Sequence, residues 1–340
     1  MKAALLLRAL TVCLLVGSLP GAPATAQEKL DKVSFGTNWV PEAEHGGFFQ
    51  ALADGTYKRY GLDVTIVPGG PNDNNRMLLI AGKLDFFMAA NTLMSLDAVA
   101  NNVPVVTVAA IFQKDPQVFL THPESKITKL EELKPLTLFV SKEGISSYYQ
   151  WLKSEYGFSE KNVKPYMFNP QPFVADGKSA MQGYVTSEPY AVEKTAGFKP
   201  GVILLADYGF NTYSTLIETR YEVIDKKPDL VQRFVDASIV GWYHYIYGDN
   251  SAGNAMIKKL NPEMTDEMLA YSVAGMKDYG IVDSGDTSQN GIGAMTDERV
   301  ASFFDKMVRA GVVKPSIDFR KSYTLRFVNK GVGLDLRPKN

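Results

Sequence analysis

The sequence has 340 residues, of which 45% are hydrophobic, and a formal net charge of −1 at pH 7. This length allows two domains or lobes, each with its own hydrophobic core. The balanced charge and the lack of a basic block argue against nucleic acid as a partner. Beyond the N-terminus, no apolar segment of the sequence is long enough to span a bilayer.

Residues 1–26 have the features of an export signal. They begin with basic residues, continue with an apolar stretch and end in the small residues at 24–26, which fit the cleavage rule. We therefore expect cleavage before Gln27 and export of the remaining chain. The one cysteine of the sequence, Cys13, lies inside this signal. The exported chain would then have no disulfide, thiolate metal site or cysteine nucleophile.

The first third of the chain alternates between strand-like and helical patterns. Apolar or alternating segments predict strands at 33–37, 62–67, 84–89 and 103–112. Helical patterns lie between them, at 44–60, in a segment capped by Asn72 or Asp73, and in a segment capped by Asn91 or Thr92. Strands that alternate with helices in this way predict a parallel sheet.

A second, smaller unit of the same kind begins near residue 113. Its strands are expected at 118–120, 136–140, 163–168 and 202–205, and a strand at 212–219 returns to the first unit. After Pro228 the pattern becomes helical, with apolar residues three and four positions apart on one face. Further helices fit 252–260, 266–279 and 297–310, and the segment 283–293 is expected to be a loop.

These elements together predict an α/β fold with two lobes, a hinged clamshell with a helical C-terminal tail. Residues 27–112 and 216–340 are expected to form lobe 1, and residues 113–215 are expected to form lobe 2. In such a fold the loops that follow the strands face one cleft between the lobes, where open α/β sheets bind ligands.

The loop after the first strand carries the densest group of candidate ligand contacts. Asn38, Trp39, Glu42 and His45 place an amide, a large ring, a carboxylate and an imidazole before a predicted helix. The glycines at 46–47 leave the start of that helix open, so that backbone N–H groups could face a ligand. The alternative is a tryptophan packed in the core beside solvated glutamates.

Other candidate contacts lie on the remaining loops of the cleft. They are Asn91, Thr92 and Phe112 in lobe 1, and Gly144, Ser146, Ser147, Tyr148, Glu188, Tyr190 and Asn211 in lobe 2. Each has a structural alternative. Phe112 is the type of residue that packs in a core, Asn91 and Thr92 can cap a helix, the serines can be ordinary first-turn residues, and Glu188 can be a solvated loop acid.

Enzyme motifs are missing from the sequence. It contains no phosphate-binding Gly-rich loop with Lys, no Gly-x-Ser-x-Gly elbow and no His-Glu-x-x-His. The histidines, at positions 45, 122 and 244, are far apart in sequence. We therefore expect no metal, no cofactor and no catalytic residues, and a binding protein is favoured over an enzyme.

The residue types of the cleft indicate the chemistry of the ligand. Rings from Trp39, Phe112 and Tyr190 with acids such as Glu42 and Glu188 suit a flat heterocycle that bears amino groups. Micromolar capture needs about 8 kcal/mol, which ring burial and one or two charge-assisted hydrogen bonds of about 1.5–3 kcal/mol can supply. An oxyanion would instead need Arg, Lys or clustered N–H groups, and the nearest basic residue is Lys142.

Three motifs resemble those of solute-binding proteins of ABC transporters. They are Asn38-Trp39-x-Pro41-x-x-x-His45-x-Gly47, Tyr60-Gly61-Leu62-Asp63-Val64, and Leu79-x-Ala81-Gly82-x-Leu84-Asp85-Phe86. The chain resembles the family that includes the thiamine-pyrimidine precursor binding proteins and the fungal pyrimidine precursor synthases. The second and third motifs are shared with sulfonate, taurine and nitrate binders, so they indicate the superfamily and not the ligand.

The resemblance implies a type II periplasmic-binding fold and capture of a thiamine-pyrimidine-like heterocycle in the periplasm. Trp39 would stack on the ring and Glu188 would engage its amino groups. The expected partners are this small molecule and an ABC permease in the membrane, with the receptor acting as a monomer. The alternatives are a sulfonate, taurine or nitrate receptor, a pyrimidine precursor synthase and an exported hydrolase.

Two departures from the family pattern bear on this interpretation. Glu42 stands where relatives usually have Asn after the proline. The fungal synthases carry a Cys-rich motif, whereas the expected exported chain has no cysteine, which argues against synthase activity.

Overall fold

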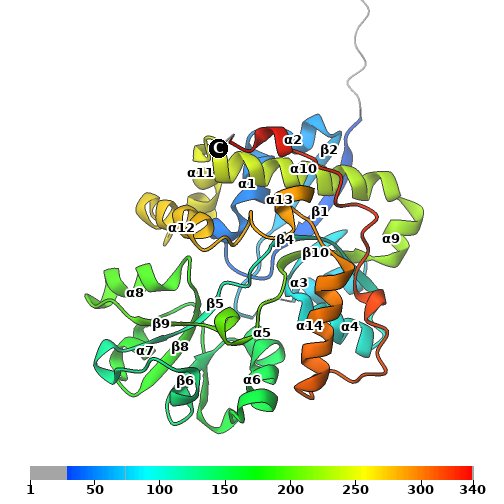
Figure 1. The fold of residues 1–340 in the computed structure, drawn as a ribbon. Helices are drawn as coiled ribbons and strands as arrows, with labels where there is room; N and C mark the ends of the chain where they lie inside the picture. Colours follow the sequence, from blue (N-terminus) through cyan, green and yellow to red (C-terminus); the bar gives the residue numbers. More distant parts are fainter. Residues whose placement is uncertain (1–28, 73, 339–340) are drawn as a thin grey trace, which may run out of the picture.

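The computed structural model describes residues 29–72 and 74–338, and the expected export signal lies outside the described residues. The chain forms two lobes, each built on a five-stranded sheet with helices around it (Figure 1). The strand order is β2-β1-β3-β10-β4 in the first sheet and β7-β6-β8-β5-β9 in the second. The predicted fold class, a two-lobed α/β clamshell with a helical C-terminal region, is confirmed.

The sheet of the first lobe is mixed and not purely parallel as the sequence pattern predicted. Its strands are β1 (Asp31–Gly36), β2 (Leu62–Val67), β3 (Phe86–Asn91), β4 (Val105–Phe112) and β10 (Ser214–Arg220). β1 pairs in parallel with β2 and β3, whereas β10 lies antiparallel between β3 and β4. The direction of β10 is reversed because it returns from the second lobe. The expected lobe boundary at 215/216 falls inside this strand.

The sheet of the second lobe contains one strand that the sequence did not indicate. Its strands are β5 (Gln117–Thr121), β6 (Thr137–Val140), β7 (Val163–Pro165), β8 (Ser179–Tyr184) and β9 (Gly201–Leu204). The unpredicted strand, β8, lies at the centre and pairs with β5 and β6. Its sequence, Ser-Ala-Met-Gln-Gly-Tyr, has no β-branched residue, so tertiary pairing overrides a weak local preference.

The helices of the first lobe differ from the prediction at two places. They are η1 (Ala43–His45), α1 (Gly46–Ala53), α2 (Thr56–Arg59), α3 (Asn75–Ile80) and α4 (Thr92–Ala100). The single helix expected at 44–60 is interrupted because Gly55 adopts a left-handed conformation with φ 78°. The cap expected at Asn72 is wrong, since α3 begins at Asn75 after Asn74, and the alternative cap Asp73 lies outside the described residues. The predicted cap Asn91 is confirmed, as its side chain accepts from the Leu93 N–H at 3.2 Å.

The remaining helices follow the second sheet and then the C-terminal region. In the second lobe they are η2 (Pro123–Ser125), η3 (Leu130–Leu133), α5 (Lys142–Ser146), α6 (Tyr148–Tyr156), η4 (Glu160–Asn162), α7 (Gln171–Ala175), α8 (Glu188–Ala196) and η5 (Leu205–Tyr208). The C-terminal helices are α9 (Tyr221–Lys226), α10 (Pro228–Tyr247), α11 (Ser251–Leu260), α12 (Asp266–Asp278), α13 (Thr287–Asn290), α14 (Asp297–Arg309), η6 (Phe319–Ser322) and η7 (Leu334–Leu336). The predicted C-terminal helices are thus confirmed, while the expected loop at 283–293 contains the short helix α13.

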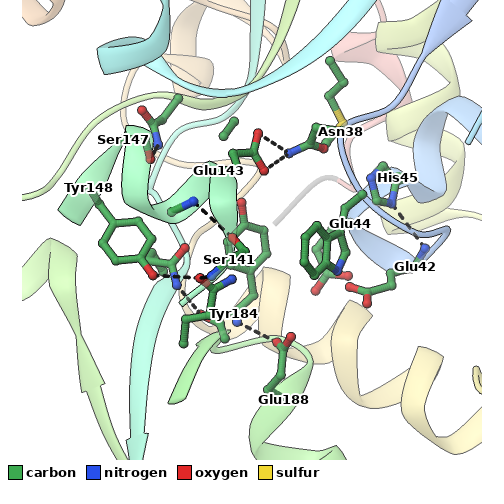
Figure 2. Close-up of a pocket in the computed structure, with 18 residues that line it drawn as sticks. Asn38, Glu42, Glu44, His45, Ser141, Glu143, Ser147, Tyr148, Tyr184 and Glu188 are labelled. Carbon is green, nitrogen blue, oxygen red and sulfur yellow. Dashed lines mark hydrogen bonds between the residues drawn. The ribbon is translucent and has the colours of Figure 1, made fainter. Parts of the chain in front are cut away.

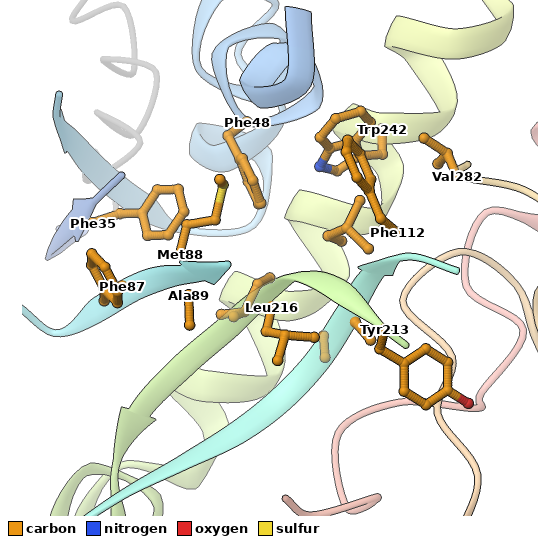
Figure 3. Close-up of a cluster of buried hydrophobic side chains, with 14 of the residues drawn as sticks. Phe35, Phe48, Phe87, Met88, Ala89, Phe112, Tyr213, Leu216, Trp242 and Val282 are labelled. Atoms are coloured by element: carbon orange, nitrogen blue, oxygen red, sulfur yellow. The ribbon is translucent and has the colours of Figure 1, made fainter. Parts of the chain in front are cut away.

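The core of the first lobe forms where α10 packs against α1 and the sheet. Figure 3 shows Trp242 of α10 beside Phe48 and Phe112, at ring centroid distances of 5.7 and 5.6 Å and nearly perpendicular. The predicted apolar stripe of α10 is therefore its buried face. A second cluster joins the other lobe to α14, with Phe210 and Phe303 at 5.7 Å, so the C-terminal region contacts both lobes.

Two glycines at the start of α1 allow α10 to come close. A Cβ on Gly47 would lie 2.2 Å from the Trp242 ring, and one on Gly46 would lie 2.1 Å from the Tyr245 ring. These glycines are therefore required by packing between helices, and they are not an open helix start facing a ligand. The packing fixes the orientation of the loop that precedes α1.

We expect Gly47→Ala to lower the free energy of unfolding by about 3 kcal/mol, because the methyl group must displace a buried indole. Urea denaturation measures this change. Gly177→Ala is the matched control, since its Cβ would meet nothing within 4 Å, and it should leave stability nearly unchanged. Equal effects of the two substitutions would contradict the packing explanation.

Candidate ligand-binding site

A cavity lies between the two lobes and is called here the inner cavity. Figure 2 shows residues that line it, which come from strands of both sheets and from the loops and helix starts that follow strands. The lining residues are Asn38, Trp39, Glu42, Glu44, His45, Met88, Ala90, Asn91, Gln117, Ser141, Glu143, Gly144, Ser147, Tyr148, Gln182, Gly183, Tyr184 and Glu188. Its volume of about 50 Å³ holds about four water molecules, so the lobes must separate to admit a heterocycle.

Many of the predicted ligand contacts meet at this cavity. They come from both lobes and are Asn38, Trp39, Glu42, His45, Asn91, Gly144, Ser147, Tyr148 and Glu188. Trp39 is partly exposed and is not sealed in the core. Its ring faces two rings of the second lobe, Tyr166 at 6.2 Å and 17° and Phe168 at 6.3 Å and 87°.

Two predicted contacts of the first lobe lie away from the cavity. Phe112 is fully buried against Trp242. It is therefore a core residue, the alternative given for it above, and it offers no surface to a ligand. Thr92 is buried as well, and its hydroxyl donates to the backbone carbonyl of Tyr213 at 3.3 Å. Position relative to a strand did not separate these residues from Trp39 and Asn91, because all four lie at or just after the end of a predicted strand.

Three predicted contacts of the second lobe also lie outside the inner cavity. Ser146 is exposed, and its hydroxyl donates to the backbone carbonyl of Glu143 at 2.9 Å. The Tyr190 ring packs against Tyr271 at 5.2 Å and lines a different cleft. Asn211 is exposed and accepts from Arg299 at 3.4 Å.

Several lining residues were not singled out from the sequence. They are Glu44, Met88, Ala90, Gln117, Ser141, Glu143, Gln182, Gly183 and Tyr184. Glu44 and Glu143 lie in the loops that the sequence analysis identified, so their acidic type was the available signal. Gln182 and Tyr184 belong to β8, whose absence from the predicted elements hid them.

Direct hydrogen bonds connect the lobes across the cavity. The Asn38 Nδ2 donates to both carboxylate oxygens of Glu143, at 3.0 and 3.0 Å, and Figure 2 shows this contact. The Asn91 Nδ2 donates to the Ser147 hydroxyl at 3.3 Å. The Thr186 hydroxyl donates to Glu44. The structure is therefore a closed form, and these contacts must break when the lobes open.

Three glutamates with perturbed pKa values surround the cavity. Burial, followed by the charges of Glu44 and Glu188, raises the pKa of Glu42 well above its ordinary value. Burial also raises the pKa of Glu44, although the hydroxyl of Thr186 opposes this shift. Burial raises the pKa of Glu188 to about 7, even though its carboxylate accepts from the Tyr184 N–H at 2.7 Å. At neutral pH these groups therefore favour a partner that can supply protons or positive charge.

His45 is a neutral hydrogen-bond donor to the cavity. Burial lowers the pKa of His45 to about 4. Its Nδ1 lies 3.2 Å from the backbone N–H of Glu42, which can only donate, so the ring proton resides on Nε2. The Nε2 atom is buried and has no partner in the described part of the chain.

Other polar atoms of the lining lack partners within residues 29–72 and 74–338. The buried acceptors Asn38 Oδ1, Glu42 Oε1 and Glu44 Oε2 belong to this group. Among the described residues no Lys or Arg lines the inner cavity. The described part of the chain also contains no group of three His, Asp or Glu side chains that could hold a metal ion. Among these unpartnered atoms the Nε2–H of His45 is a donor, and a glutamate that keeps its proton adds an O–H donor beside the carbonyl-type acceptors.

Replacing Glu188 should change how stability depends on pH. Its pKa is about 7 in the folded protein and near 4.3 when unfolded, so its favourable contribution is complete below about pH 4.3 and is lost as pH rises through 7. Between pH 5 and 8, the unfolding free energy of the original protein should fall relative to Glu188→Gln by on the order of 1–3 kcal/mol.

Urea denaturation at each pH, without added ligand, measures this difference. Glu193→Gln is the control, because Glu193 is exposed on the same helix, and it should keep the original pH profile. If Glu188→Gln also keeps that profile, Glu188 does not titrate as its burial requires.

Most of the chain superposes on a solved periplasmic binding protein. The periplasmic aliphatic sulphonate binding protein SsuA from Escherichia coli superposes with a TM-score of 0.61, 15% identity, and coverage of 86% of this chain and 91% of that one. The two share the periplasmic-binding-protein fold. Within the described residues no helix has the length and apolar character needed to cross a membrane.

Sequence relatives cover much of the chain. The riboflavin-binding protein RibY of Chloroflexus aurantiacus is 24% identical over 319 residues, covering 91% of this chain and 90% of that protein. A formylaminopyrimidine-binding protein of Halalkalibacterium halodurans is 23% identical, covering 76% and 79%. A 4-amino-5-hydroxymethyl-2-methylpyrimidine phosphate synthase of Saccharomyces cerevisiae is 27% identical, covering 61% and 65%.

The family described as NMT1/THI5 like matches residues 42–249, which is more than half of the chain. The match includes Glu42, Glu44 and His45 of the cavity loop and continues through the second lobe to the end of α10. The predicted resemblance is confirmed, and the chain belongs to the NMT1/THI5-like family.

Proposed function

We propose that this protein is the periplasmic substrate-binding protein of an ABC importer and captures an aromatic nitrogen heterocycle between its lobes. The ligand class is a flat ring that carries several N–H donors, of the aminopyrimidine type. The observation that carries the proposal is the chemistry of the inner cavity, where buried carboxyl groups meet no lining cation in the described chain.

The hydrogen-bonding pattern of the cavity supports a donor-rich ligand. Unpartnered oxygens of Asn38, Glu42 and Glu44 would accept from amino and ring N–H groups, while the Nε2–H of His45 would donate to a ring nitrogen or carbonyl. Hydrogen bonds to charged groups contribute about 1.5–3 kcal/mol each. The order of magnitude suits micromolar or tighter binding once ring burial is added.

The aromatic wall supports a flat ligand. A ring inserted between Trp39 and Tyr166 would need a separation of about 7 Å, twice the optimal carbon contact distance. Their centroids are 6.2 Å apart, so a small opening of the lobes would admit it. Hinge closure would then bury the ring on both faces.

The relatives support the same class. The names of the relatives from C. aurantiacus and H. halodurans refer to riboflavin and to a formylaminopyrimidine, and both are nitrogen heterocycles. A sulfonate or nitrate receptor is the alternative raised by the fold. An anion at this site would lie against Glu42, Glu44 and Glu188 with no lining Lys or Arg in the described chain, and its desolvation would not be compensated.

A binding experiment tests the ligand class. Isothermal titration with 4-amino-5-hydroxymethyl-2-methylpyrimidine should show binding, whereas taurine, an alkanesulfonate and nitrate should not bind. Trp39→Ala should weaken binding by about 10- to 100-fold, since it removes ring burial and stacking of about 1.5–3 kcal/mol.

Ser146→Ala is the matched control, because Ser146 is exposed outside the cavity, and it should bind like the original protein. An anion receptor would show the opposite pattern, with sulfonate or nitrate bound and Trp39→Ala nearly silent.

The second candidate function is catalysis, since the yeast relative is named as a synthase. His45 is the lining residue to test as a catalyst. Its ring is neutral, its Nδ1 accepts from the Glu42 N–H and its Nε2 carries the proton, so neither nitrogen is free to accept a proton. The described chain also contains no thiol. We expect the purified protein to return the bound heterocycle unchanged when the mixture is analysed by mass spectrometry. Product that forms with the original protein and disappears with His45→Ala would establish an enzyme.

A further inference from the structure

A second, larger space adjoins the inner cavity and is called here the outer cleft. Its volume is about 960 Å³, against about 50 Å³ for the inner cavity. One wall is formed by residues 166–171 and helix α8 of the second lobe, and the other by residues 263–268 at the start of α12. Figure 1 shows α8 and α12 on the same side of the molecule, one from each lobe.

The two spaces adjoin at one shared lining residue. Glu188 lines both of them. Its Oε1 accepts from the Tyr166 hydroxyl at 3.2 Å, and Tyr166 faces the Trp39 ring. Tyr166 and Glu188, two of the side chains proposed to contact the flat ring, therefore also line the outer cleft, whereas Trp39 lines the inner cavity.

The outer cleft has the chemistry of a ring-binding surface. Phe168 and Tyr190 provide rings, while Met264 and Met268 provide thioethers, which contact aromatic rings favourably. The Ser187 hydroxyl lies at the cleft with its residue 1% exposed, and its Oγ has no partner in the described chain. A buried hydroxyl of this kind needs a polar partner.

The charge of the outer cleft excludes some substituents. Glu188, Glu263 and Glu267 line it, and Lys194 is its basic lining residue within the described chain. Lys194 also lies over the Tyr190 ring at 5.3 Å. The excess of acidic groups disfavours a phosphate or carboxylate substituent and accommodates a neutral or cationic one.

We propose that the ligand is an extended molecule with two ring systems, whose nitrogen-rich head binds in the inner cavity and whose second ring lies in the outer cleft. The second ring is neutral or cationic and has a polar atom for the Ser187 hydroxyl. This inference rests on the proposed function, because the head is the heterocycle proposed above. It adds a second subsite, formed by both lobes, that favours long ligands over short ones.

A comparison of two probes tests the second subsite. The head alone is represented by 4-amino-5-hydroxymethyl-2-methylpyrimidine, and the two-ring probe is thiamine, which joins an aminopyrimidine to a cationic thiazolium ring. The original protein should bind thiamine at least about 10-fold more tightly than the head alone, as measured by isothermal titration.

Ala191→Trp should fill the outer cleft from α8 without entering the inner cavity, since Ala191 lines the outer cleft but not the inner cavity. It should reduce thiamine affinity to that of the head and leave head binding within about twofold. Glu193→Trp, exposed on the same helix and outside the cleft, is the matched control and should change neither affinity. Ser187→Ala, which adds no bulk, should weaken thiamine binding by a few-fold and spare the head.

Each result decides between the two proposals. Equal affinities of the two probes for the original protein, or loss of both probes with Ala191→Trp, would overturn the second subsite while the proposed function stands. Slower association of both probes with unchanged affinity would identify the outer cleft as an entry path and also overturn it. If neither probe binds, the aminopyrimidine head is wrong and both proposals fail.

Discussion

Burial of carboxyl groups between two lobes is the constraint on which the function of this molecule depends. Glu42, Glu44 and Glu188 lie at the lobe boundary with pKa values raised mainly by burial. A buried carboxylate without a cation is costly, so each group must keep its proton or meet a donor. The closed form meets part of this need internally, through the Thr186 hydroxyl, the Tyr184 N–H and the Tyr166 hydroxyl. In the function proposed above, a ligand rich in N–H groups would meet the rest, and this would couple its capture to lobe closure.

The scaffold holds the cavity loop by packing and the hinge by polar contacts. Close approach of α10 to the glycines at the start of α1 fixes the loop that carries His45. The guanidinium group of Arg299 contacts both segments in which the chain crosses from one lobe to the other. Arg299 of α14 donates to the backbone carbonyl of Gln113 and to Asn211, and it lies 4.3 Å above the Tyr213 ring. Helix α14 thus contacts both segments of the chain that cross between the lobes.

The accuracy of the sequence-based elements follows the strength of their local signal. The helices predicted in the C-terminal region match α10, α11, α12 and α14 closely, because their apolar periodicity is a local feature. The strand β8 was missed because its stability comes from neighbours on both sides and not from its residue types. The direction of β10 was missed for a related reason, since the sense of a returning strand depends on the path of the chain through the second lobe.

The candidate site shows the same division between local and tertiary information. The sequence by itself determined that a loop after the first strand carries a ring, acids and an imidazole, because residue type and position relative to a strand are local properties. Trp39 and Phe112 are both large rings at the carboxyl ends of predicted strands, yet the first faces the cavity and the second packs on Trp242. Only the tertiary structure decided this, and it also brought Glu143 within 3.0 Å of Asn38. The physical reason is that exposure to a cleft, and the pKa shifts that follow from burial, depend on how two lobes pack across more than a hundred residues of sequence.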